Sequence, residues 1–259
     1  MQNAVTTYKL RAVAFWLTIC FALAGLACPV WAEDSIQGHL GAGVLTGFPQ
    51  GEFKRNVNQM GYGVGGSGAG YISKRVPLAI GLSLGYLTYG SESRKEPFSS
   101  TIPDVTVEVT TTNSILLGHF LLRLQPRDGT LRPYLEGMAG FNYLFTKTKI
   151  TDVGDDEEIA SSTNLDDLVF SYGVRSGLMI KVYEGVEQDD AGDDEDAGGQ
   201  EAPWAYSVSL DLGVYYLLGG EASYLKKGSI RRADDRVAYD IIRSKTDLIT
   251  AHIGITLSR

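Results

Sequence analysis

The chain is organised by stretches in which every second residue is apolar, the period-2 pattern of a β-strand with two unlike faces. In residues 77–89, large aliphatic and tyrosine side chains alternate with alanine, glycine and serine. The same alternation recurs along the chain, more regularly in some segments than in others. The strands predicted in this way are 36–47, 61–72, 77–89, 114–124, 134–145, 168–182, 204–218 and 249–257.

Eight strands of about ten residues, joined by polar linkers, are typical of an antiparallel up-and-down transmembrane β-barrel. No helical periodicity of useful length is found after residue 32. A soluble β-sandwich also alternates apolar with polar residues, so the alternation alone leaves both folds open. The predicted fold class is therefore all-β, and a second feature of the sequence is needed to distinguish a barrel from a sandwich.

The aromatic residues favour the barrel, because they collect near the ends of the predicted strands. Amphipathic rings are stable at the headgroup depth of a membrane, whereas a sandwich has no reason to sort its rings by height. If the first strand runs outward, the outer girdle contains Tyr62, Tyr86, Tyr89, Phe141, Tyr143, Phe145, Phe170, Tyr172, Tyr215 and Tyr216. The opposite girdle contains Tyr71, Tyr134, Tyr183, Trp204 and Tyr206.

The second face of the predicted strands carries charged residues near mid-strand. An eight-stranded barrel has an interior filled by side chains, so charges on that face can pair across neighbouring strands. The predicted interior polar network consists of Glu136, Arg175, Asp211, His252 and His39. The alternative is that these side chains are solvated on one side of an open sheet.

Residues 1–32 have the three-part layout of a secretory signal peptide, with Lys9 and Arg11, an apolar run and a cleavage site after Ala32. The alternatives are a membrane anchor, for which the run 12–27 is short of the ~20 residues required, and a lipoprotein cut before Cys28. Since Cys20 and Cys28 are the two cysteines, the exported chain has no thiol for a disulfide or a metal. The remainder, 33–259, is expected to be one barrel domain.

The formal net charge of the full chain is −8, which argues against a nucleic-acid partner. The glycine-rich segment 61–70 is not a phosphate-binding loop, because neither Lys-Ser/Thr nor a helix follows it. No metal-ligand spacing is found, and no cofactor is expected.

Two segments carry a family resemblance. They are the glycine-rich opening His39-Leu40-Gly41-Ala42-Gly43 and the run 132–143, Arg-Pro-Tyr-Leu-Glu-Gly-Met-Ala-Gly-Phe-Asn-Tyr. With the signal peptide, they make the chain similar to the OmpA-like family of small eight-stranded outer-membrane β-barrels, which includes opacity and porin-like proteins. The resemblance implies a bacterial outer-membrane location, insertion by the outer-membrane insertion machinery, and long outer loops.

The predicted linkers are strongly charged. Of the outward linkers 48–60, 90–113, 146–167 and 219–246, the third is acidic and the fourth is basic, so that the two could attract each other. Polybasic segments bind anionic lipids, so the fourth could contact lipopolysaccharide phosphate or a surface partner. Its candidate residues are Lys226, Lys227, Arg231, Arg232 and Arg236. The inward linker 184–202 is predicted to be a disordered acidic insertion, because its spacing does not fit an EF-hand.

The function predicted from these features is non-enzymatic, namely envelope structure and surface interaction through the outer loops. One alternative is a narrow porin-like channel for small solutes. Another is a lipid A modifying enzyme, in which His252 and His39, on neighbouring strands of the closed barrel, would be the candidates. No serine nucleophile motif accompanies them, so an interior His39–His252 pair with a structural role is expected instead.

Overall fold

The computed structural model describes residues 37–73, 75–99, 102–152, 158–187, 204–226, 228–233 and 236–259. The compact unit Gly38–Arg259 contains all the secondary structure discussed below. The predicted signal peptide 1–32 and most of the acidic segment 184–202 lie outside the described residues.

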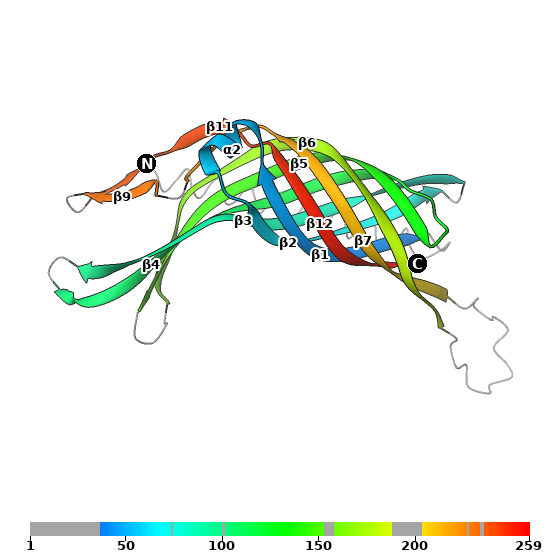
Figure 1. Ribbon diagram of the computed structural model, residues 1–259, viewed down its shortest axis with the longest axis horizontal. Helices are drawn as coiled ribbons and strands as arrows, with labels where there is room; N and C mark the ends of the chain where they lie inside the picture. Colours follow the sequence, from blue (N-terminus) through cyan, green and yellow to red (C-terminus); the bar gives the residue numbers. More distant parts are fainter. Residues whose placement is uncertain are drawn as a thin grey trace. The chain divides into compact units, whose positions relative to one another are not determined.

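Eight strands close into one antiparallel barrel with the order β1-β12-β7-β6-β5-β4-β3-β2 (Figure 1). The strands are β1 (Gly38–Pro49), β2 (Gly61–Ser73), β3 (Val76–Ser99), β4 (Ile102–Leu124), β5 (Leu131–Asp152), β6 (Glu158–Glu187), β7 (Trp204–Gly219) and β12 (Leu248–Ser258). Each overlaps one of the predicted strands, so the predicted eight-stranded barrel is confirmed. Among the described residues, no helix has the length and apolar character needed to span a membrane.

The barrel has two distinct ends. At the terminal end, the backbone N–H of Gly38 donates to the carbonyl of Arg259 at 3.0 Å, which closes the seam between β1 and β12. At the opposite, loop end, β3 to β6 continue beyond the neighbouring strands as a projecting sheet (Figure 1). The expectation that 90–113 and 146–167 are linkers is therefore wrong for most of their length. These segments are rich in serine and threonine, and they pair as strands.

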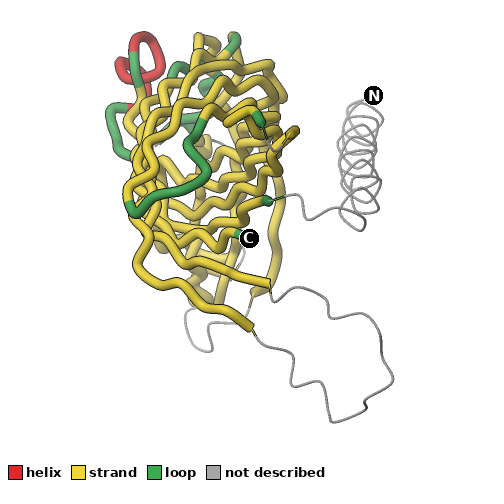
Figure 2. Tube along the Cα trace, turned by 90° about the vertical axis from the view of Figure 1, so that its right-hand side faces the viewer, coloured by secondary structure: helices red, strands yellow, loops and turns green. Residues whose placement is uncertain are grey.

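The loop end also carries a short helix, α2 (Gly51–Val57), and two small hairpin sheets (Figure 2). One sheet pairs β8 (Glu221–Tyr224) with β11 (Ile242–Lys245), and the other pairs β9 (Ile230–Ala233) with β10 (Arg236–Tyr239). The helix was not predicted, because two turns are too short for a helical period to be recognised. It is stabilised by its one buried side chain, Phe53, and ends at Asn58 in the left-handed conformation with φ 46°.

Side chains alternate between the two faces of the wall, apart from irregularities such as the register shift between Lys181 and Tyr183. In β5, odd-numbered positions from Leu131 to Phe141 are exposed and the even-numbered positions between them are buried. The same parity corrects the predicted girdles, because four of their tyrosines face the interior and are nearly inaccessible. These are Tyr71, Tyr89, Tyr134 and Tyr215.

Glycines let the strands approach closely where large side chains enter the interior. A Cβ added to Gly43 of β1 would lie 2.7 Å from Nε2 of His252. The glycines of the opening segment therefore leave room for the imidazole on the neighbouring strand.

Candidate functional site

The outward surface of the barrel wall is apolar between its two ends. No outward position of the described wall between the two rims carries a charged residue. Its exposed aliphatic side chains come from every barrel strand and are half or more exposed. They include Leu40, Val44, Val64, Ile80, Leu84, Leu122, Leu135, Val174, Val214, Ile253 and Ile255. A wall that exposes such a surface all the way round is suited to an apolar surrounding rather than to water.

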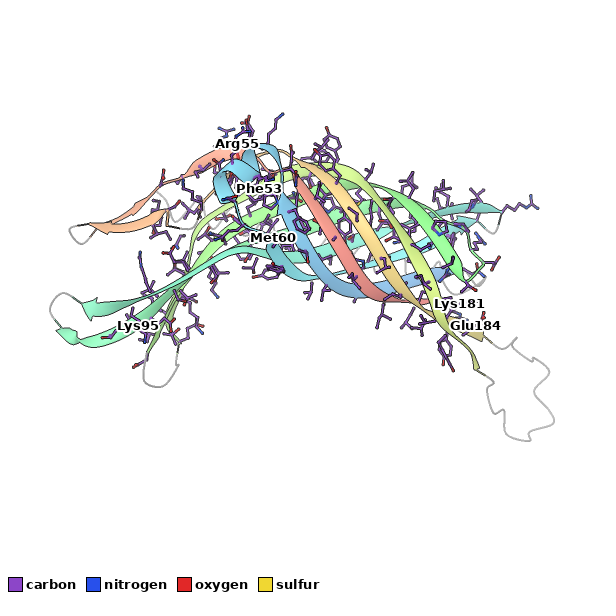
Figure 3. All side chains as sticks on the ribbon, viewed as in Figure 1. Phe53, Arg55, Met60, Lys95, Lys181 and Glu184 are labelled. Atoms are coloured by element: carbon purple, nitrogen blue, oxygen red, sulfur yellow. The ribbon has the colours of Figure 1, made fainter. Side chains whose placement is uncertain are left out.

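Aromatic rings border this apolar belt. Toward the loop end, Phe141 and Phe170 make an edge contact with centroids 5.9 Å apart, and Tyr143 stacks on Phe145 at 5.4 Å. Toward the terminal end, Tyr183 and Tyr206 lie 6.0 Å apart. Rings at both borders of an aliphatic belt have the arrangement of the interfacial girdles of membrane barrels. Figure 3 shows side chains projecting outward along the wall.

The interior toward the terminal end holds a cluster of buried charges. Glu136 accepts a hydrogen bond from Nε of Arg123 and pairs with Nη1 of Arg175 at 3.6 Å. Nη2 of Arg175 also donates to Asp211 at 2.9 Å. This interior polar cluster consists of His39, Arg123, Tyr134, Glu136, Arg175, Asp211 and His252, all of them buried.

Aromatic rings and hydroxyls complete the cluster. The Tyr134 hydroxyl donates to Asp211 at 2.7 Å, and its ring lies 4.5 Å from the guanidinium carbon of Arg123 and 5.1 Å from that of Arg175. Cation–π contact and hydrogen bonding together offset part of the cost of burying these groups, although Nη2 of Arg123, Oε2 of Glu136 and Nε of Arg175 have no hydrogen-bond partner. Neither Arg123 nor Tyr134 was predicted to belong to the interior network, because Arg123 lies near the end of its strand and Tyr134 was assigned to the girdle opposite the outer one. Their in-facing parity, shared with Glu136, could have identified them.

The two histidines do not pair with each other, contrary to the interior pair expected from the sequence. In the β1–β12 register, His39 lies opposite Ser258 and His252 lies opposite Leu45, so the two positions are six residues apart along the seam. His39 instead contacts Nη1 of Arg123, whereas Nδ1 of His252 accepts a hydrogen bond from Arg175 at 3.0 Å. Both imidazoles therefore act as acceptors for the guanidinium groups of the cluster.

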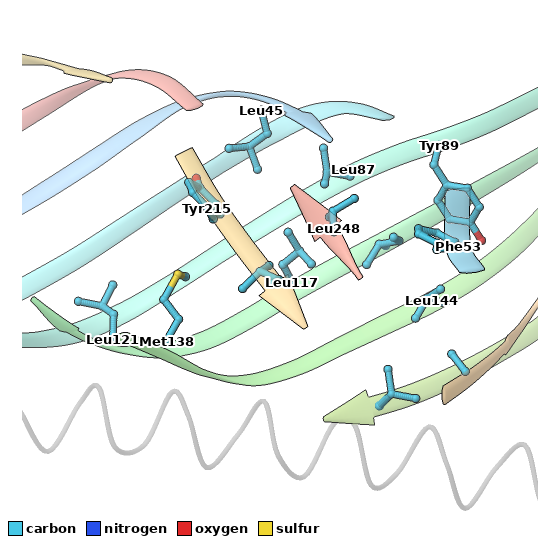
Figure 4. Close-up of a cluster of buried hydrophobic side chains, with 14 of the residues drawn as sticks. Leu45, Phe53, Leu87, Tyr89, Leu117, Leu121, Met138, Leu144, Tyr215 and Leu248 are labelled. Carbon is cyan, nitrogen blue, oxygen red and sulfur yellow. The ribbon is translucent and has the colours of Figure 1, made fainter. Parts of the chain in front are cut away.

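Toward the loop end, the interior is filled by apolar side chains (Figure 4). Phe53 of α2 is fully buried and makes edge contacts with Tyr89 at 5.4 Å and Tyr224 at 5.1 Å. We call this group the apolar plug, and its members are Leu45, Phe53, Leu87, Tyr89, Leu117, Leu144, Leu217, Tyr224 and Leu248. The plug therefore packs the interior at the loop end with apolar side chains.

The helix that supplies Phe53 is attached to the fourth loop. Nδ2 of Asn56 donates to the Tyr224 hydroxyl at 3.0 Å, and Glu52 accepts from the backbone N–H of Lys245 at 3.3 Å. The backbone N–H of Gln50 also donates to the carbonyl of Asp247 at 2.9 Å. These contacts hold the helix over the mouth of the barrel.

A serine–histidine contact is found in the wall, but its geometry does not suit nucleophilic catalysis. His119 Nε2 lies 2.7 Å from the Ser171 hydroxyl, which itself donates to Asn142 Oδ1 at 2.8 Å. Since the hydroxyl has one proton, the imidazole must donate to it and cannot act as its base. All three side chains are buried, which keeps the hydroxyl away from a substrate.

The predicted basic residues of the fourth loop are only partly described. Lys226 is exposed, Lys227 lies outside the described residues, and only the backbones of Arg231, Arg232 and Arg236 are described, in β9 and β10. The loop binds the projecting sheet, where Glu92 accepts from the N–H of Gly228 at 2.9 Å and Arg94 donates to the carbonyl of Ile230 at 3.2 Å.

The predicted attraction between the acidic third linker and the basic fourth linker involves several side chains outside the described residues, among them those of 155–157 and of Arg231, Arg232 and Arg236. Asp167 accepts from the backbone N–H of Ser223 at 2.9 Å, so a charged side chain meets a backbone group. Among the fourth loop's own charges, Arg243 pairs with Glu221 at 3.5 Å.

The acidic segment 184–202 begins and ends at the terminal end of the barrel. Glu187 pairs in register with Trp204, and β7 then runs beside the C-terminal residues, with Ser207 opposite Ser258. Its one described side chain, Glu184, pairs with Lys181 at 2.8 Å. No cluster of potential metal ligands is found among the described residues.

No protein-family model and no curated protein matches this sequence. Solved structures that align with it include Ail, the attachment invasion locus protein of Yersinia pestis, in complex with the heparin analogue sucrose octasulfate. That alignment has 8% identity and a TM-score of 0.36, and it covers 87% of this chain and 100% of Ail. Neisserial surface protein A aligns with 9% identity and a TM-score of 0.34, covering 87% of this chain and 96% of that protein. A major outer membrane protein from Thermus thermophilus aligns with 11% identity and a TM-score of 0.33, covering 86% of this chain and 99% of that protein. TM-scores this low carry no argument, so the fold assignment rests on the strand pairing.

Proposed function

We propose that the chain is a bacterial outer-membrane β-barrel protein of the OmpA-like kind. It is non-enzymatic and serves envelope structure and surface interaction through its loop end. The observation that carries this proposal is the uncharged apolar belt, bordered by aromatic rings and set around an interior that holds a buried cluster of charged side chains. This distribution of polarity is the reverse of that in a soluble protein.

Closed barrels are one of the two structures that can cross a bilayer with every backbone group satisfied. Here each strand pairs on both sides along the wall, including the seam between β1 and β12. The wall therefore meets the hydrogen-bonding requirement of the membrane as well as the polarity requirement.

The closed mouth favours a scaffold over a channel. Phe53 and its neighbours fill the interior at the loop end, while paired charges fill it toward the terminal end. An eight-stranded barrel is just wide enough for such side chains, so a solute path would require displacing them.

Lipopolysaccharide is proposed as a partner of the loop end. Exposed basic side chains are described there on α2, on β11 and in the fourth loop. They are Lys54, Arg55, Lys226, Arg243 and Lys245. Each cation near an anionic lipid surface is worth about 1 kcal/mol.

A charge placed on the belt tests the membrane location. Leu84 is 60% exposed, so Leu84→Arg would be harmless or favourable for solubility if the belt faced water. In a membrane it should cost about 2–4 kcal/mol and lower the yield of folded barrel. Ser93→Arg on the projecting sheet, where Ser93 is exposed, is the matched control and should fold normally.

The readout is heat-modifiable migration of membrane fractions, unboiled against boiled, with protease treatment of intact cells. The proposal expects a faster unboiled band and cleavage confined to the loop end. A water-soluble product without a band shift, unaffected by Leu84→Arg, would overturn it and favour a soluble β-barrel.

A further inference from the structure

The buried charges of the barrel interior do not balance. Within the described wall, the buried charged side chains are Arg123, Arg132, Arg175, Glu136 and Asp211. The two carboxylates are already engaged, Glu136 by Arg123 and Arg175, and Asp211 by Arg175. Arg132 has no carboxylate partner in this part of the chain, although it is only 7% exposed.

Every acceptor around Arg132 is neutral. Its Nη2 donates to the Ser209 hydroxyl at 2.7 Å and to the Ser258 hydroxyl at 3.4 Å, and its Nη1 reaches the carbonyl of Arg127 at 3.5 Å. Its Nε is buried without an acceptor. Neutral oxygens satisfy individual N–H groups, but they leave the positive charge of the guanidinium uncompensated in a desolvated place.

A second guanidinium faces the same part of the seam. Arg123 donates to His39, and His39 lies opposite Ser258, the residue whose hydroxyl Arg132 contacts. Nη2 of Arg123 is also buried without an acceptor. Two guanidinium groups with unused donors therefore flank His39 at the terminal end.

We propose that this site binds an inorganic oxyanion of the phosphate class, held between Arg132 and Arg123 and entering from the terminal end of the barrel. A guanidinium presents its donors as a planar fork that matches the oxygens of phosphate, and a charged acceptor makes stronger hydrogen bonds than a hydroxyl. One bound anion would balance the interior charge.

The test is the stability of the folded barrel in a phosphate-free detergent such as a maltoside. Sodium phosphate is titrated against sodium gluconate at matched ionic strength and pH, and equilibrium unfolding is followed by circular dichroism. A ligand that binds the folded state raises the folded-to-unfolded ratio by about tenfold for each tenfold increase above its Kd. The proposal expects this rise with phosphate and little with gluconate.

Variants locate the site. Arg132→Gln should abolish the phosphate-specific rise, whereas Arg55→Gln, on the exposed surface of α2 at the other end of the barrel, should retain it. If Arg132→Gln does not fold, Arg132→Lys keeps the charge but loses the fork, and it should bind phosphate more weakly. Heat-modifiable migration of each variant checks its folding.

Three results would overturn the proposal. The first is that phosphate and gluconate stabilise the barrel equally. The second is that phosphate stabilises the Arg132 variants as much as the parent protein. The third is that phosphatidylglycerol stabilises the barrel and inorganic phosphate does not. The last result would assign the same chemistry to a lipid headgroup. Because the titration uses folded barrel in detergent, it does not depend on the cellular location proposed above.

Discussion

The two ends of the barrel interior are filled by different chemistry. Toward the terminal end, Glu136 and Asp211 are held among guanidinium groups, with each contact fixed by distance and direction. Toward the loop end, Phe53 and Leu217 are buried among other apolar side chains, where contact depends on shape rather than on direction. Removing one member should therefore be most costly in the polar region, where it leaves a buried charge unpaired, and less so in the apolar region, where it leaves a cavity.

The largest effect is expected for Glu136→Gln. This change keeps the size of the side chain but leaves Arg123 without its carboxylate and Arg175 with Asp211 alone. Breaking a buried ion pair in this way costs about 3–5 kcal/mol. Urea unfolding of the barrel in lipid vesicles, followed by circular dichroism and gel mobility, measures the loss.

The control for that variant is Glu158→Gln on the projecting sheet. Glu158 pairs with Lys149 at 3.5 Å, but both side chains are more than two-fifths exposed. Its loss should change the free energy of unfolding little, because solvent screens an exposed ion pair. If both variants lose the same free energy, the interior cluster does not hold the desolvated charges described here.

The plug is tested by Leu217→Ala, which removes a side chain with no exposed surface. A cavity of this kind costs about 2–5 kcal/mol, depending on how far the neighbours relax. Val214→Ala, on the lipid-facing side of the same strand, is the control and should cost less, because lipid can fill the space. A Leu217→Ala barrel as stable as the parent protein would mean that the plug is loosely packed.

A smaller loss is expected for Tyr134→Phe. The ring remains stacked on both guanidinium groups, but Asp211 loses the hydroxyl that donates to it at 2.7 Å. An acceptor left unsatisfied in the interior costs about 1–3 kcal/mol. Tyr183→Phe, on a ring that is 55% exposed, should be nearly neutral by the same unfolding measurement.

Much of the wall could be predicted from the sequence, because a strand with two unlike faces has a period of two residues. That pattern located all eight strands and put Glu136, Arg175, Asp211 and His252 on one face. It could not predict the partners of His39, because the contact with Arg123 crosses the barrel interior and depends on the stagger of the strands.

The projecting sheet was missed for a related reason. The segment 105–112 reads Val-Thr-Val-Glu-Val-Thr-Thr-Thr and belongs to β4, in which Val107 is buried. The polar run 110–114, Thr-Thr-Thr-Asn-Ser, separates its valines from the apolar run that begins at Ile115, so the alternation of the wall does not reach them. Arg132 was not predicted to face the interior because it precedes the predicted strand 134–145, whereas β5 begins at Leu131.

The smallest effect is expected on that projecting sheet. Ser93 and Thr110 share a hydrogen bond of 2.7 Å, yet water competes for both hydroxyls because the pair is exposed. Ser93→Ala should therefore change the free energy of unfolding by no more than about 0.5 kcal/mol. Amide hydrogen exchange of the folded barrel supplies the second readout, because the projecting part of β3 should exchange faster than its wall portion around Leu84. A loss as large as that of Tyr134→Phe, or equal protection of both portions of β3, would show that the projecting sheet folds as one unit with the wall.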